Sequence, residues 1–176
     1  MNISKYIGMA HLSGMMVENL YGIIFQKHIL LDNLYFMSLI MIPLSWILCK
    51  DECIVSYLVK KYENPHYILG SEPANVSDIE ELFPDRPTYN MFCHINHGLR
   101  MVSLIIVNNR TTHVSYVLLV PTFTLYTIYI YHVFYKPLCN TLKNIGIMIE
   151  NPSYFFRPIL AIYLSMVLFM LTIFKK

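Results

Sequence analysis

Histidine and cysteine are the side chains in this sequence that could support metal or redox chemistry. The candidates are His11, His94, His97, His132, Cys49, Cys53, Cys93 and Cys139. Imidazole and thiolate are the usual ligands of zinc, copper and haem iron. The spacing is less specific, because the nearest histidines are three residues apart and the nearest cysteines four apart, which matches no compact zinc signature. One hypothesis is therefore a membrane redox protein with a haem or zinc cofactor.

Two charged residues, Glu18 and Arg100, fall inside long apolar stretches. A charge alone in hydrocarbon costs at least a few kcal/mol, so such residues are usually paired. If each stretch is a helix entering from the same side, a rise of about 1.5 Å per residue places Glu18 about 18 Å deep and Arg100 about 16 Å deep. We expect an ion pair that fixes helix packing, and a second hypothesis makes it the centre of a small transporter or proton relay.

Sequence patterns of common enzymes are missing. The chain has no G-x-S-x-G, no phosphate-binding glycine loop, no H-E-x-x-H and no dinucleotide fingerprint, and it contains only six glycines. Di-iron oxidases and hydroxylases need more clustered histidines than this sequence supplies. The main expectation is therefore a non-enzymatic, structural or scaffolding membrane component whose loops contact a protein partner.

The composition indicates a lipid environment. Of the 176 residues, 56% are hydrophobic and 14% charged, whereas soluble domains carry about 25% charged residues. Fourteen tyrosines and ten phenylalanines suit membrane interfaces. The net charge of +2 and the lack of a basic run exclude a nucleic-acid partner. The bilayer is the expected partner.

Five apolar stretches have the length of about 20 residues that a membrane-spanning helix needs. They cover 6–26, 29–48, 89–107, 114–135 and 158–174. The predicted fold class is an all-α integral membrane protein, a single bundle of about five transmembrane helices with an interfacial amphipathic helix. A three-span alternative stays open, in which the stretches containing Glu18 and Arg100 pack against protein or lie in the interface.

The polar loop 49–88 joins the second and third spans. Apolar residues at helical spacing predict an amphipathic helix over 51–61 that continues the second span along the membrane surface. The sequence Ser-Asp-Ile-Glu at 77–80 predicts a capping box and a short helix. Asp51 and Glu52 are expected in a solvated turn, and Asp32 is expected to stabilise the start of the second span.

The side of the membrane that holds the N-terminus is called side A. Eight basic residues outside the spans fall on side A, namely Lys5, Lys50, Lys60, Lys61, Arg86, Lys136, Lys143 and Arg157. Four fall on the other side, namely Lys27, Arg110, Lys175 and Lys176. The excess predicts an integral membrane protein with a cytoplasmic N-terminus. The same depth argument places the four candidate histidines and all four cysteines near side A, which favours a shared site.

One segment also carries a resemblance. The stretch WILCKDECIVSY at 46–57, the lysines at 60–61 and NPHYILG at 64–70 are similar to a segment of uncharacterised small multi-pass membrane proteins of large DNA viruses and protists. The similarity covers about a quarter of the chain. It implies a viral or virion membrane protein, and it carries over no catalytic residue.

Overall fold

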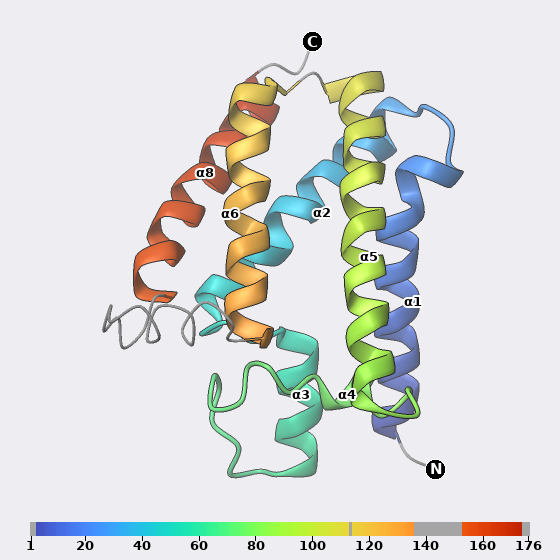
Figure 1. Ribbon diagram of the computed structural model, residues 1–176, viewed down its shortest axis with the longest axis vertical. Coiled ribbons are helices and arrows are strands. Elements are labelled where there is room, and N and C mark those ends of the chain that lie inside the picture. Colours follow the sequence, from blue (N-terminus) through green and yellow to red (C-terminus); the bar gives the residue numbers. More distant parts are fainter. Residues whose placement is uncertain (1–2, 113, 136–152, 174–176) are drawn as a thin grey trace.

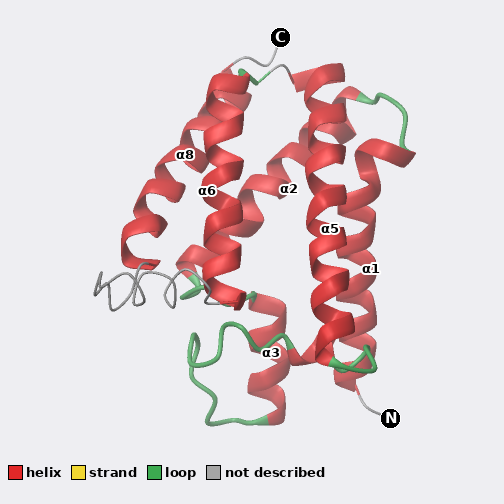
Figure 2. Ribbon diagram, viewed as in Figure 1, coloured by secondary structure: helices red, strands yellow, loops and turns green. Residues whose placement is uncertain are grey.

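The computed structural model describes residues 3–112, 114–135 and 153–173, which form helices joined by loops without a strand (Figure 2). The helices are α1 (Ile3–Ile24), α2 (Ile29–Leu48), α3 (Ile54–Glu63), α4 (Ser77–Glu80), α5 (Arg86–Val107), the π-helical η1 (Asn108–Thr112), α6 (Tyr116–Tyr135) and α8 (Ser153–Ile173). The all-α class predicted from the sequence is confirmed. A long helix occupies each of the five apolar stretches.

The long helices alternate in direction along the long axis of the molecule (Figure 1). Helices α1 and α5 pack side by side, α6 packs on α8, and α2 crosses obliquely and contacts α8. The short helices α3 and α4 lie at the end that holds the N-terminus, and the 25–28 loop lies at the other end (Figure 1). Segments far apart in sequence, such as α1, α3 and α4, therefore meet at one end.

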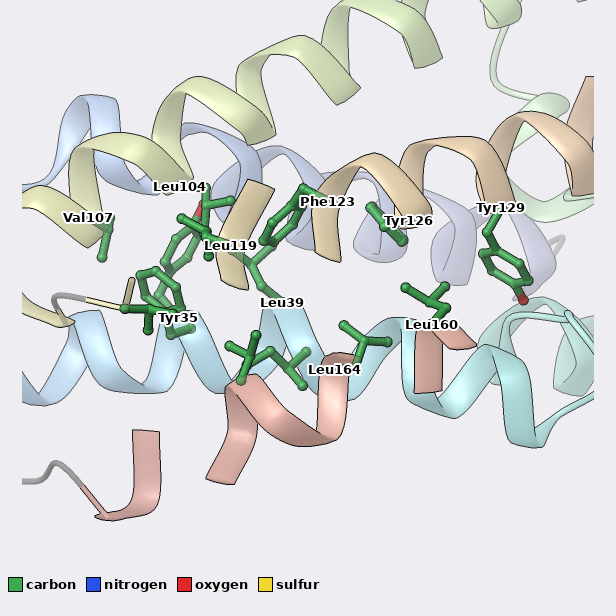
Figure 3. Close-up of a cluster of buried hydrophobic side chains, with 14 of the residues drawn as sticks. Tyr35, Leu39, Leu104, Val107, Leu119, Phe123, Tyr126, Tyr129, Leu160 and Leu164 are labelled. Carbon is green, nitrogen blue, oxygen red and sulfur yellow. The ribbon is translucent and has the colours of Figure 1, made fainter. Parts of the chain in front are cut away.

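An apolar core joins α2, the C-terminal half of α5, α6 and α8 (Figure 3). Phe36 and Leu160 are fully buried, and Leu104 and Leu164 are 1% exposed. Burying a side chain of this size contributes about 1.5–3 kcal/mol. This core fixes α2, α6 and α8 against one another, and it reaches α1 at Tyr21.

Local signals set several helix ends. The side chain of Asp85 caps α5 by accepting a hydrogen bond of 2.7 Å from the backbone N–H of Thr88, and Pro87 occupies the first turn. His28 caps α2 by accepting from the N–H of Leu31. The expected capping box at 77–80 is wrong, because α4 begins after Val76 and no side chain caps it.

The expectation of a solvated turn at Asp51 and Glu52 is also wrong. Glu52 is fully buried, and it accepts hydrogen bonds of 2.7 Å from Lys60 Nζ and from the backbone N–H of Gly70. Asp51 is buried against Tyr129, whose hydroxyl donates a 2.7 Å hydrogen bond to it. Each carboxylate is balanced by a polar partner, so burial is tolerated.

Helix α3 forms close to the predicted surface helix but has a different orientation. It follows the long axis of the molecule past the end of α2, beside the first turns of α1, instead of continuing α2 across the end of the bundle (Figure 1). Lys50 and Asp51 adopt positive φ values of 55° and 70°, which turn the chain sharply between α2 and α3. The buried ion pair of Glu52 with Lys60 then fixes the helix.

Asp32 lies in the first turn of α2, as expected, but its main partners come from elsewhere in the chain. It is fully buried and accepts hydrogen bonds from Arg110 at 2.6 Å and from the hydroxyl of Tyr21 at 2.8 Å. This cluster ties α1, α2 and η1 together at the end of the molecule opposite α3.

Among the described helices, α2 alone is both long and apolar enough to cross a membrane. Shorter apolar runs occupy Tyr116–Tyr131 in α6 and Phe156–Thr172 in α8. The five crossings expected from the sequence stay a prediction.

Candidate functional site

A cysteine, a histidine and an aspartate form a hydrogen-bonded series where α1, α3 and α4 meet. The Sγ atom of Cys53 lies 3.6 Å from Nε2 of His11. On the other side of the ring, Nδ1 of His11 lies 2.7 Å from Oδ2 of Asp78. A thiol, an imidazole and a carboxylate in this order are the arrangement of a nucleophile, its base and the group that orients the base.

Close helix packing brings these residues together. Gly8 lies one turn before His11 on α1, and a Cβ atom there would overlap the backbone carbonyl of Asp78. Only glycine therefore lets α4 approach α1 this closely. Ser56 on α3 donates a 2.7 Å hydrogen bond to Oδ1 of Asp78, which leaves Oδ2 for the imidazole.

The surroundings of Cys53 favour its thiolate. Burial raises the pKa of the thiol, but the hydrogen bond and charge of His11 and the backbone amides of Val55 and Ser56 outweigh it, so the pKa lies below the usual cysteine value. Cys53 is also the residue that precedes α3, where helix amides point outward and stabilise an anion. Burial also raises the pKa of Asp78, but the hydrogen bonds from His11 and Ser56 lower it by more. The pKa therefore lies below the usual aspartate value, and the carboxyl stays ionised at neutral pH.

A cavity of about 110 Å³ lies beside the thiol and the imidazole. Its wall includes the apolar side chains of Met15, Val76 and Ile130. Two buried amide atoms in the wall, Nδ2 of Asn19 and Oδ1 of Asn96, have no hydrogen-bond partner among the described residues. The site therefore combines a nucleophile with a mostly apolar space and a few polar contacts, as small-molecule sites do.

Glu18 and Arg100 lie in contact, with Arg100 Nη2 3.1 Å from Glu18 Oε2. The guanidinium also donates hydrogen bonds of 2.6 Å to Oδ1 of Asn19 and to the hydroxyl of Tyr126. Ser38 of α2 donates to the second oxygen of Glu18 at 3.1 Å. Arg100 is 8% exposed, so a fixed polar network joins α1, α2, α5 and α6 in the interior.

His11, His94 and His97 line the same cavity, but their described polar contacts are with different partners. His94 Nδ1 lies 2.6 Å from the carbonyl oxygen of Asn90 on its own helix, and His97 Nε2 lies 3.0 Å from Oγ1 of Thr127 on α6. The side chain of His132 is outside the described part of the chain. Within the described residues, no group of three His, Cys, Asp or Glu side chains is arranged to hold a metal ion.

The three described cysteines do not all lie at one place. Cys53 and Cys93 line the cavity, Cys49 does not, and Cys139 lies outside the described residues. Cys49, Cys53 and Cys93 are all free thiols. The expected thiol cluster is thus reduced, for the described cysteines, to two residues on one cavity.

Sequence reasoning selected His11 and Cys53 but missed their relation. They are 42 residues apart, and Asp78 is 67 residues from His11, so no local spacing links them. The pattern around Asp78 predicts only the start of a short helix. The only available signal was the shared expectation that the three segments lie near side A.

Comparisons of the chain with family models, with curated proteins and with solved structures gave no match.

Proposed function

We propose that this chain is a multi-pass membrane protein that performs acyl transfer with Cys53 as its nucleophile. The observation that carries the proposal is the series from Cys53 through His11 to Asp78, with contacts of 3.6 and 2.7 Å. An ester or thioester of a carboxylic acid is the substrate class that such a thiol attacks. The cavity beside the thiol supplies space for the acyl group.

The residues divide the reaction among them. The Cys53 thiolate forms a bond to the acyl carbon, the bond from that carbon to the leaving oxygen or sulfur breaks, and the leaving group takes a proton from the His11 imidazolium. Water or an alcohol then attacks the thioester carbon and gives its proton to His11. The S–C bond breaks, and Cys53 leaves as the thiolate again. Asp78 holds the ring by its Nδ1–H, so that Nε2 faces the thiol.

The distribution of polar and apolar side chains supports the membrane setting. Leu30, Leu34 and Met41, at helical spacing on α2, are 50–63% exposed. In contrast, Asn19 and Asp32 are fully buried. Apolar residues outside and polar residues inside suit a bundle whose solvent is lipid.

The up-and-down course of the chain is also that of the five-span topology. The loop 49–88 lies at the end with the N-terminus, and the 25–28 loop lies at the opposite end (Figure 1). In this setting Cys53 sits beyond the end of α2, at the level of the membrane surface, where it meets substrates from lipid and from water. Side A remains the proposed cytoplasmic side.

A non-enzymatic structural component is the second candidate. It is favoured by the polar network of Arg100, in which the guanidinium is held by Glu18, Asn19 and Tyr126 at 2.6–3.1 Å. Such fixed contacts suit a packing role better than a transporter gate, which must change partners. The reactivity of Cys53 decides between the two candidates.

The test uses the full chain in detergent or vesicles, with every cysteine except Cys53 replaced by serine. We expect its alkylation by iodoacetamide to reach half of its maximal rate at a pH below that of the unfolded chain, because the folded pKa is lower. His11→Gln removes interactions that lower the pKa of Cys53 and leaves the burial that raises it, so the pH of the midpoint should rise. Each pH unit of that rise corresponds to about a tenfold loss of thiolate at a fixed lower pH.

A matched chain that keeps only Cys49 is the control, and its profile should not respond to His11→Gln. A p-nitrophenyl ester should in addition release a burst of p-nitrophenolate and leave an acyl group on Cys53, detected by intact mass. A midpoint like that of the unfolded chain, or no acylation of Cys53, would leave the structural component as the better explanation.

A further inference from the structure

The cavity that Cys53 and His11 line is small. Its volume is about 110 Å³, whereas a cavity of about 150 Å³ is known to hold one benzene molecule. One water molecule occupies about 30 Å³ in the liquid, so a space of about 110 Å³ holds about three to four non-hydrogen atoms. An acetyl group on the sulfur adds three such atoms, and a propionyl group adds four. Acyl groups of this size therefore match the cavity.

The wall next to the thiol includes side chains from α4. Nε2 of His11 lies 3.6 Å from the Sγ atom of Cys53, and Nδ1 of the same ring lies 2.7 Å from Oδ2 of Asp78. Ile79 follows Asp78 directly, and Val76 precedes it by two residues. Both line the cavity. An acyl group attached to the thiol therefore meets α4 within a few atoms.

This part of the wall is apolar and closely packed. Val76 and Ile79 are 6% and 3% exposed, and they form a small apolar core with Tyr89 of α5. Met15 lies one helical turn after His11 on α1, packs against this core and also lines the cavity. Inserting extra methylene groups into packed side chains is unfavourable, because the neighbours must leave their preferred rotamers. The packing thus limits the length of a group bound here.

We infer that the acyl group accepted by Cys53 is short, an acetyl or propionyl group. The inference rests on the proposed acyl transfer, and it adds the substrate class, an ester or thioester of a two- or three-carbon acid. The apolar end of the acyl group contacts Met15 and Val76 in the cavity wall. A longer acyl chain must displace these side chains. The leaving alcohol or thiol is not limited in this way, because it departs while the acyl group stays.

The probes are the p-nitrophenyl esters of acetic, propionic, butyric and octanoic acid. They are used with the full chain in detergent, with Cys53 as its only cysteine, and p-nitrophenolate release and intact mass give the rate of acylation. Each rate is divided by that of the chain that keeps only Cys49, which does not line the cavity. This ratio removes the intrinsic reactivity of each ester and its partition into micelles.

We expect similar ratios for the acetate and the propionate, and a ratio for the octanoate that is lower by about tenfold or more. The butyrate should lie between them. Equal ratios for the acetate and the octanoate, or a higher ratio for the octanoate, would overturn the inference.

Met15→Ala should weaken this preference, because it removes a side chain from the cavity wall. The octanoate should gain severalfold relative to the acetate. Met16→Ala is the matched control, since Met16 is the next residue of α1, is half-buried like Met15 and does not line the cavity. The control should retain the preference. A preference that is equal in the two variants would contradict a limit set by the cavity wall.

Two features keep the test decisive. The ester series uses the unchanged cavity, so it holds even if Met15→Ala does not fold. Alkylation by iodoacetamide reports whether the thiol is intact in each chain. A thiol that the acetate and the octanoate acylate alike overturns only the substrate class, whereas a reactive thiol that no ester acylates overturns the acyl transfer as well.

Discussion

The half of the bundle around α1 and α5 and the half around α2, α6 and α8 are held together by different forces. In the second half, Leu39, Leu160 and Leu164 pack in an apolar core (Figure 3). In the first half, Arg100 and Glu18 pair in the interior beside a cavity. Apolar packing tolerates substitutions of similar volume, whereas buried polar groups depend on each partner. The polar half is therefore the one that can place a site with precision.

Breaking the ion pair should give the largest effect. Arg100→Gln or Glu18→Gln alone leaves an uncompensated charge in the interior and should destabilise the bundle by about 3–5 kcal/mol. The double variant should be much milder, because no charge is then left without a partner. Thermal unfolding of the detergent-solubilised chain measures all three. Additive effects would show that the two residues do not interact.

Removing bulk from the apolar half should lower stability without affecting the thiol. Leu164 is 1% exposed, and Leu164→Ala should cost about 2–5 kcal/mol through lost burial and the cavity left behind. Iodoacetamide should still alkylate Cys53 at the rate of the unchanged chain. A slower reaction would mean that the two halves are coupled and that the comparison between them is too simple.

Separating α1 from α4 should have a smaller effect on stability and a clear effect on the site. In Gly8→Ala the new Cβ would overlap the backbone carbonyl of Asp78, so α4 must shift. The shift should lower the free energy of unfolding by about 1–3 kcal/mol. The contact of His11 with Asp78 should loosen, and Cys53 should be alkylated more slowly at neutral pH.

Gly14→Ala is the matched control for Gly8→Ala. It lies on the same helix, and no atom lies within 4 Å of the Cβ position. It should stabilise the chain by up to about 1 kcal/mol through helix propensity, with no change at Cys53. If both glycine variants slow the alkylation equally, the close approach of α1 and α4 is not what positions Asp78.

Local patterns predicted the long helices well. The expected range 29–48 coincides with α2. The expected range 89–107 covers all of α5 except the first turn of that helix. Apolar run length and flanking polar residues are properties of short segments, so they can be evaluated without the rest of the chain. The capping of α5 by Asp85 has the same local character.

The loop 49–88 shows where such patterns fail. Asp51 and Glu52 are charged and follow the apolar stretch 29–48, which favours a solvated turn, yet both are buried. Their burial depends on Lys60, Gly70 and Tyr129, the last of which lies 78 residues away from Asp51. Nothing within a window of a few residues identifies these partners.

The sequence alone determined the helical class, the helix positions and the identity of the reactive residue types. It also predicted that Glu18 and Arg100 lie at one depth, because helix rise converts residue number into height. Only the tertiary structure decided that His11 faces Cys53 and Asp78 instead of the other histidines. The physical reason is that the helical rise per residue sets how far along its helix a residue lies. The rotation of each helix and its contacts depend instead on packing against distant segments, such as α4 against Gly8 of α1.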